Sequence, residues 1–95
     1  MANIKTRSDW TTEETYWRQN YKNRPYFETG RDYEYYGPAY RFGYDATDRY
    51  SNKQWNDVER DLERDWDRYE HRGQSTWAQI KAAVRDAWDR MVGNR

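Results

Sequence analysis

Apolar residues recur at helical spacing twice in the C-terminal half of the chain. In both copies they lie three or four residues apart, and an Asp-Arg pair occupies the same place in each. This spacing puts the apolar side chains on one face of an α-helix. It predicts amphipathic helices at about 55–71 and 76–92, joined by a segment short enough for an antiparallel helical hairpin. The matching positions are Trp55, Val58, Leu62, Trp66 and Tyr69 in the first copy and Trp77, Ile80, Val84, Trp88 and Met91 in the second.

Capping signatures place two helix starts. Thr76 with Gln79 forms a capping box ahead of the second copy, in which each side chain bonds the other residue's backbone N–H. Thr11 with Glu14 forms the same pattern near the start of the chain. We therefore expect a short upstream helix at about 12–21.

Pro38 suggests where a further helix begins. Proline is favoured at the first helical position, because its missing N–H would be unsatisfied there in any case. A helix is therefore expected over about 38–50. The preceding residues, 23–36, alternate too weakly for a strand and are expected to form an ordered, extended connection.

Aromatic residues outnumber the aliphatic residues that usually build a core. The chain has six Trp, ten Tyr and two Phe in 95 residues. Low aliphatic content usually signals disorder, but each buried aromatic ring removes roughly 150–250 Å² from water. We expect one small, mainly α-helical domain over 10–95, preceded by an N-terminal tail at 1–9 that need not be ordered. The complete set of Leu, Ile and Val residues is Ile4, Val58, Leu62, Ile80, Val84 and Val92.

The charge balance and the absence of cysteine narrow the class of protein. The chain has 17 basic and 17 acidic residues, so its total charge favours neither nucleic acid nor an anionic membrane. Without cysteine there is neither a disulfide scaffold nor a thiolate metal site. No apolar run approaches the length of a membrane span or a signal peptide. A cytoplasmic protein without a membrane partner is expected.

Tyrosine and arginine dominate the candidate association surface. Residues 31–44 contain five tyrosines, and rings that remain at a surface beside Arg are typical of protein–protein interfaces. On helix 55–71 an Arg row alternates with acidic rows. That pattern is either a solvated, self-neutralised face or a face that docks the acidic row of a second copy. We expect a homo-oligomer whose interface includes Tyr33, Tyr35, Tyr36, Tyr40, Tyr44, Arg60, Arg64 and Arg68.

Residues 16–27 support a second hypothesis. They interleave cations with aromatic rings and contain no acid. Single-stranded nucleic acids stack on aromatic platforms flanked by Arg. The competing interpretation is that the rings pack inside while the cations extend over them. The candidate residues for a single-stranded nucleic-acid-binding module are Trp17, Arg18, Tyr21, Lys22, Arg24 and Tyr26.

A metal site or an enzyme is a weaker hypothesis. Glu63, Asp67 and His71 have i, i+4, i+8 spacing and would share one helix face. No second helix visibly contributes ligands, so a solvated charge row is the better interpretation. Acid–base catalysis needs a concave apolar pocket, which the sequence does not locate. The sequence identifies no catalytic residue, metal, cofactor or small-molecule ligand, and we expect a protein that is not an enzyme.

Two motifs resemble a group of small, uncharacterised Tyr- and Trp-rich bacterial proteins that are loosely associated with stress response. The first motif is the tyrosine block "DYEYYGPAYRFGYD" at 32–45, and the second is "WNDVERDLERDW" followed by "STWAQIKAAVRDAWDRM". Together they cover most of residues 16–91. The resemblance implies an accessory role in stress tolerance and supplies no reaction, ligand or site residue. The sequence thus favours a non-enzymatic, self-associating protein.

Overall fold

The computed structural model describes residues 8–71 and 75–92 and is mainly α-helical there, as predicted. No strand occurs in these two ranges. The prediction for residues 1–9 falls largely outside the described residues. The helices are α1 (Trp10–Asn20), the short 3-10 helix η1 (Tyr21–Asn23), α2 (Tyr33–Arg49), α3 (Trp55–Arg68) and α4 (Trp77–Val92).

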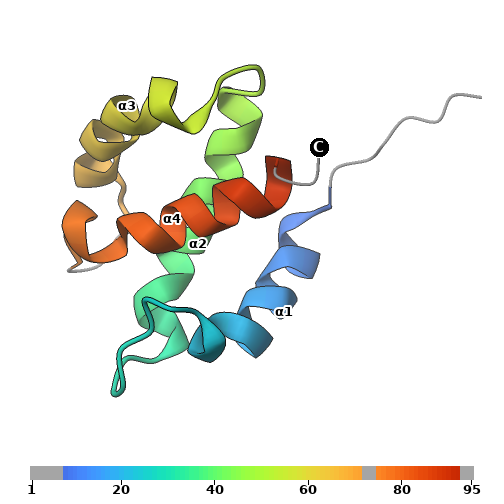
Figure 1. The fold of residues 1–95 in the computed structure, drawn as a ribbon, viewed down its shortest axis with the longest axis vertical. Helices are drawn as coiled ribbons and strands as arrows, with labels where there is room; N and C mark the ends of the chain where they lie inside the picture. Colours follow the sequence, from blue (N-terminus) through green and yellow to red (C-terminus); the bar gives the residue numbers. More distant parts are fainter. Residues whose placement is uncertain (1–7, 72–74, 93–95) are drawn as a thin grey trace, which may run out of the picture.

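Helices α2 and α4 cross at the centre of the fold and form its closest helix pair (Figure 1). The crossing is built from small residues. Ala39, Gly43 and Ala46 lie along one face of α2 and are buried, and Ala83 and Ala87 are buried on α4. Small side chains let two backbones approach closely, whereas Leu or Phe at these positions would hold them apart.

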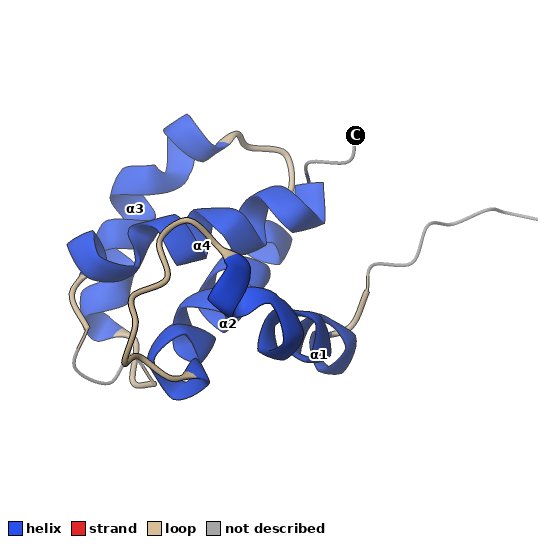
Figure 2. Cartoon of the chain, turned by 60° about the horizontal axis from the view of Figure 1, so that its bottom comes forward, coloured by secondary structure: helices blue, strands red, loops and turns tan. Residues whose placement is uncertain are grey.

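The other two helices flank this pair on opposite sides, α1 on one and α3 on the other (Figure 1). Helix α1 packs on α2, while α3 contacts α4 less extensively than α2 does. Helix α4 follows α3 in the chain, but it has its largest contact with α2. A second connection, between η1 and α2, runs as an irregular loop close to α4 (Figure 2).

Two helices begin earlier than predicted. Helix α1 begins at Trp10 rather than near Thr12, because the Asp9 side chain accepts from Thr12 N at 3.0 Å and takes the capping role assigned to Thr11. This hydrogen bond from Thr12 lowers the pKa of Asp9. Helix α2 begins at Tyr33, capped in the same way by Asp32, so the connection that precedes it is shorter than predicted.

Pro38 consequently lies inside α2 rather than at its first position. The N–H that proline lacks would have paired with the carbonyl of Glu34. Glu34 is exposed, so water can bond that carbonyl instead. Gly37, which precedes the proline, has no Cβ to clash with the proline ring. A strong cap at Asp32 therefore overrides the local preference of proline.

Both predicted apolar stripes face the core. Trp66 is fully buried and donates its Nε1–H to Ser75 O at 3.1 Å, and Trp88 is 2 % exposed. The Thr76 capping box also forms, since Gln79 Oε1 accepts from Thr76 N at 2.9 Å. The aromatic core continues into α1 and α2, where the rings of Trp17 and Tyr40 stack with centroids 4.2 Å apart. In the described ranges no helix is both long enough and apolar enough to span a membrane.

Candidate functional site

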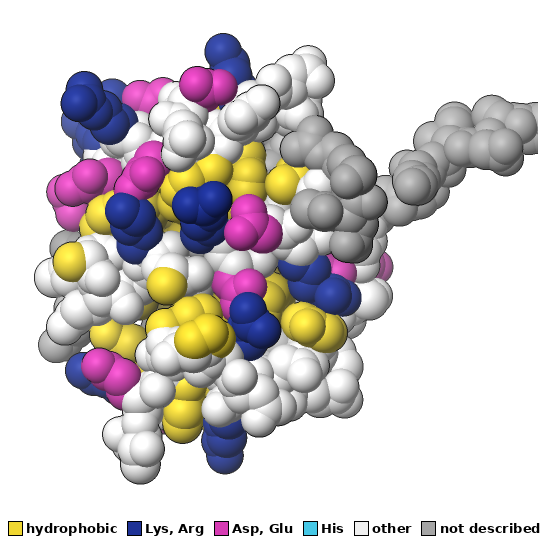
Figure 3. Space-filling model, in the orientation of Figure 1, with side chains coloured by type: hydrophobic (Ala, Val, Ile, Leu, Met, Phe, Trp, Pro, Cys, Tyr) yellow, Lys and Arg dark blue, Asp and Glu magenta, His cyan; other side chains and the backbone are white. Residues whose placement is uncertain are grey.

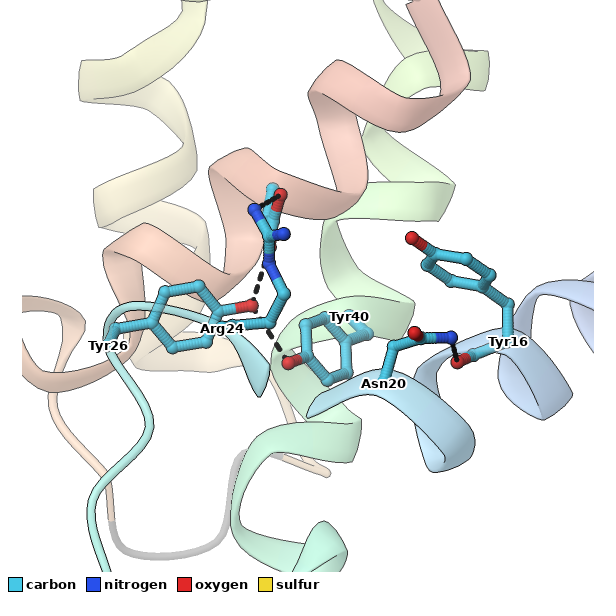
Figure 4. Close-up of polar contacts among 6 residues, drawn as sticks. Tyr16, Asn20, Arg24, Tyr26 and Tyr40 are labelled. Carbon is cyan, nitrogen blue, oxygen red and sulfur yellow. Dashed lines mark hydrogen bonds and ion pairs between the residues drawn. The ribbon is translucent and has the colours of Figure 1, made fainter. Parts of the chain in front are cut away.

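Two residues of the basic and aromatic segment 16–27, Arg24 and Tyr26, bond to Asp86 of α4. With Tyr40 they form a cluster around Asp86 that we call the latch. Arg24 makes a two-pronged contact with Asp86, with Nε to Oδ2 at 2.6 Å and Nη2 to Oδ1 at 3.0 Å. The Tyr26 hydroxyl donates to Asp86 at 2.7 Å and lies 2.8 Å from the Tyr40 hydroxyl. Figure 4 shows Arg24 and Tyr26, from the loop before α2, converging with Tyr40 of α2. Asp86 therefore fixes the loop before α2 to the middle of α4.

Burial keeps the tyrosines of this latch neutral. Desolvation, with further contributions from Tyr40 and Asp86, raises the pKa of Tyr26 far above its usual range. Desolvation likewise raises the pKa of Tyr40. A neutral Tyr26 can donate a proton in a hydrogen bond to Asp86, which a tyrosinate cannot. The pKa of Arg24 is raised by its hydrogen bond to Asp86.

Most of the rings proposed for nucleic-acid stacking are not exposed. Trp17 and Tyr21 are 2 % and 8 % exposed, and Tyr21 meets Tyr33 and Phe27 edge-on. Arg18 lies 4.3 Å over the Tyr33 ring centroid and also pairs with Glu14. Lys22, in η1, is exposed, and its Nζ lies 5.9 Å from the Tyr21 ring centroid. The structure thus places these rings inside with the cations over them, which matches the competing interpretation of this segment.

Basic and acidic side chains are interspersed across the α4 face of the molecule rather than gathered in a basic patch (Figure 3). Hydrophobic side chains reach the surface between them (Figure 3). A surface of mixed sign is less suited to a phosphate backbone than to another protein surface.

The tyrosine block divides between core and surface. Tyr33, Tyr36 and Tyr40 are 7 %, 2 % and 0 % exposed, so they offer little area to a partner while the domain is folded. Tyr35 is half-buried beneath the guanidinium of Arg31, which lies 4.2 Å from its ring centroid. Tyr44 is half-buried and donates to Ser8 O at 2.8 Å. The predicted arginine row lies on a different helix, α3.

The outer face of α3 presents exposed charges, which we call the α3 charged face: Arg60, Glu63, Arg64 and Asp67. Within the described residues Arg60, Glu63 and Asp67 make no ion pair. Arg64 pairs with Asp61, three residues earlier on α3, at 3.2 Å. This face is therefore only partly neutralised by its own helix.

Asp57 and Asp65 also lie three residues before an arginine of α3, but they have different partners. Asp57 accepts from the backbone N–H of Gln54 at 3.4 Å and so caps the start of α3. Asp65 turns toward Arg49 of α2, at 3.8 Å, and toward Arg64, at 3.7 Å. Arg60 and Arg68 are left as exposed cations with no ion pair to any described residue.

A groove of about 750 Å³ lies beside this face. One wall is the Trp10, Glu14 and Arg18 row of α1, and the opposite rim is formed by Arg68 and the residues just after α3. Trp, Tyr and Arg are the residue types enriched at the energetic centres of protein–protein interfaces. The sequence signal that was missed is the i, i+4, i+8 spacing in α1. The full lining is Trp10, Glu14, Arg18, Tyr33, Glu34, Gly37, Pro38, Arg41, Asp45, Arg68, Tyr69, Glu70 and His71.

Tyr33 lies in this lining with its hydroxyl buried and without a hydrogen-bond partner in the described residues. Its ring lies against Gly37, where a β-carbon would come within 2.8 Å of Cε2. Burial, followed by the charge of Glu14, raises the pKa of Tyr33. A buried hydroxyl left unpaired costs stability.

The row suggested as a metal site is interrupted. Helix α3 ends at Arg68, so His71 lies beyond the helix that carries Glu63 and Asp67. His71 instead contacts Glu70, with Nε2 to Oε2 at 3.4 Å, and meets the Tyr69 ring edge-on. No group of three or more metal-ligating side chains is found in the part of the chain that the structure describes.

Comparison with known proteins adds no functional information. No protein-family model, curated protein or solved structure matches the chain. The functional argument therefore rests on the surfaces themselves. Two of them carry chemistry that the fold leaves unsatisfied, namely the α3 charged face and the neighbouring groove.

Proposed function

We propose that the protein is a non-enzymatic association protein whose partner is a second copy of the same chain. The observation that supports this is the order of charges on the α3 charged face. The four residues of this face, at positions 60, 63, 64 and 67, are positive, negative, positive and negative in that order. Reversed, the same series reads negative, positive, negative, positive. The face is thus complementary to itself when two helices lie antiparallel.

The proposed pair has a two-fold axis that passes between positions 63 and 64. Arg60 then faces Asp67 of the second copy, and Glu63 faces Arg64 of the second copy. Each contact occurs twice, as a two-fold interface requires. Positions 60, 63, 64 and 67 share one side of a helix, because they are three or four residues apart.

Ion pairs of this kind set register and partner choice more than affinity. An exposed pair contributes roughly 0.2–1 kcal/mol, so four of them make a weak and salt-sensitive interaction. The half-buried Tyr69, just after α3, adds apolar area at the end of the same surface. The Trp, Tyr and Arg side chains of the groove continue that surface from Arg68.

The cellular role follows from resemblance alone. The tyrosine block and the two repeated motifs resemble bacterial proteins loosely associated with stress response, so we propose that association serves stress tolerance. A cytoplasmic location is part of the same proposal. Balanced charge and the mixed-sign surface support a protein partner over nucleic acid.

Charge reversal tests the pairing directly. In Arg60→Glu the two acids at positions 60 and 67 repel across the axis, and in Asp67→Arg two cations do. Each variant alone should therefore be monomeric by sedimentation velocity at low salt. An equimolar mixture should form a heterodimer, because the glutamate introduced at position 60 of one variant would face the arginine introduced at position 67 of the other.

The control is Lys22→Glu, which changes an exposed cation outside the face by the same two charge units. It should sediment as the wild type does. The antiparallel α3 pair would be contradicted if either charge-reversal variant alone associated as strongly as the wild type. It would also be contradicted if the mixture of the two stayed monomeric.

A further inference from the structure

A second hollow, of about 370 Å³, lies where the N-terminal end of α3 meets the C-terminal end of α4. It does not include the α3 charged face or the groove. Its chemistry differs from theirs, because its charged side chains are mainly cationic. The residues that line it are Asn52, Lys53, Gln54, Trp55, Asn56, Arg85, Trp88, Asp89 and Val92.

Trp55 provides an unsatisfied hydrogen-bond donor in this lining. It is 5 % exposed, and its Nε1 has no acceptor among the described residues. The ring is held by stacking on Trp77, with centroids 6.4 Å apart, and by an edge contact with Trp88 at 5.9 Å. An indole nitrogen donates and never accepts, so whatever completes this site must supply an acceptor atom.

Two nearby cations favour an anion as the missing acceptor. Lys53 is exposed and makes no ion pair with a described residue. Arg85 lies 5.5 Å over the Trp55 ring and holds Asp89 only loosely, with Nε to Oδ2 at 3.5 Å. Asp89 is the one acid among the residues that line the hollow, so two cations face one carboxylate.

The start of α3 adds to this bias. Helix α3 has 14 residues and begins at Trp55, inside the hollow. The N–H groups of Gln54 and Asp57 are already bonded in the capping box at this helix start. The N–H groups of Trp55 and Asn56 lack intrahelical partners, and the helix dipole places partial positive charge there. These features together form a common setting for phosphate and other oxyanions.

We propose that this hollow binds a small tetrahedral oxyanion, either inorganic phosphate or the phosphate group of a small monoester. Lys53, the backbone N–H groups of Trp55 and Asn56, and Trp55 Nε1 supply the donors. Arg85 is exposed, so it can move from the Trp55 ring to the anion and open the path to the indole N–H. The proposal is independent of the self-association argued above, because the two surfaces share no residue.

The indole N–H signal of Trp55 in a proton–nitrogen correlation NMR spectrum tests this site directly. Trp55→Phe assigns the signal by removing it. Titration with sodium phosphate should shift it in a saturable manner, and sodium chloride at matched ionic strength should not. Glycerol 3-phosphate distinguishes the two sources, since a monoester site responds to it and a site for the free ion does not.

Lys53→Gln should weaken phosphate binding by up to about fivefold, the contribution of one partly exposed charge contact. Lys22→Gln removes an exposed lysine far from the hollow and should leave the midpoint unchanged. The site is refuted if chloride moves the Trp55 signal as phosphate does, or if Lys53→Gln and Lys22→Gln have equal midpoints.

Discussion

Gly43 of α2 lies so close to the main-chain carbonyl of Val84 on α4 that no β-carbon fits between them. The Ala87 side chain closes the same point from the next turn, 3.0 Å from where that β-carbon would be. The central crossing therefore depends on one residue type at one position. Everything that α4 positions, including the latch at Asp86, depends on this approach.

Gly43→Ala should destabilise the fold by about 1–3 kcal/mol, because backbone atoms of α4 must move to admit the methyl group. Chemical denaturation measures the change. Glu34→Ala is the control in the same helix. Glu34 is exposed and makes only an exposed contact with Arg18, so its loss should cost little. Equal losses in the two variants would show that the crossing is not set by Gly43.

The apolar stripes of α3 and α4 supply large parts of the core. Trp66→Ala and Trp88→Ala should each reduce the free energy of unfolding by about 3–5 kcal/mol, because both rings are almost fully buried. Trp66→Ala also removes the hydrogen bond to Ser75 O. Urea denaturation followed by circular dichroism measures both losses. Midpoints unchanged in both variants would mean that the stripes do not face the core in solution.

Asp86 should contribute more to stability than Asp89, which lies about one turn further along α4. Asp86→Ala leaves Arg24 and the Tyr26 hydroxyl without their acceptor, and a hydrogen bond to a charged group contributes roughly 1.5–3 kcal/mol. Asp89→Ala removes only an exposed contact with Arg85 and should cost little. Hydrogen exchange should show faster amide exchange in residues 24–31 for the first variant alone. The same rate in both variants would argue against a latch.

Stability should fall as pH rises above about 10. The pKa values of Tyr26 and Tyr40 are raised in the folded protein, so the unfolded chain loses these protons first. Below the unfolded pKa their contribution is fully present, and above it each buried tyrosine costs up to about 1.4 kcal/mol per pH unit. Denaturation at pH 9 and pH 11 measures the slope. Tyr26→Phe should reduce the fall in the free energy of unfolding between these two pH values. The same fall in this variant as in the wild type would contradict the claim that Tyr26 stays protonated in the folded latch.

Local patterns in the sequence predict a helix well where one face of the helix is buried and the other is exposed. The stripe from Trp55 to Trp66 repeats every three or four residues, and the Thr76 capping box marks a helix start, so both could be inferred without coordinates. The start of α2 could not, because Pro38 suggested a later beginning. The Asp32 cap, combined with Gly37 ahead of the proline, outweighs that preference.

The functional surfaces depend on long-range contacts that no local pattern contains. Arg24 and Asp86 are separated by most of the chain, and only the α2–α4 crossing brings them together. The groove likewise combines α1, α2 and the end of α3. By contrast, the charge order from Arg60 to Asp67 lies on one helix and is readable from the sequence once the exposed face is known.

Light scattering coupled to size-exclusion chromatography tests self-association most directly. At low salt and rising protein concentration, the measured mass should approach twice that of one chain. In 1 M sodium chloride it should return to the mass of one chain, because the Debye length falls to about 3 Å and the α3 ion pairs are screened. A mass of one chain at every concentration in low salt would contradict the proposed function.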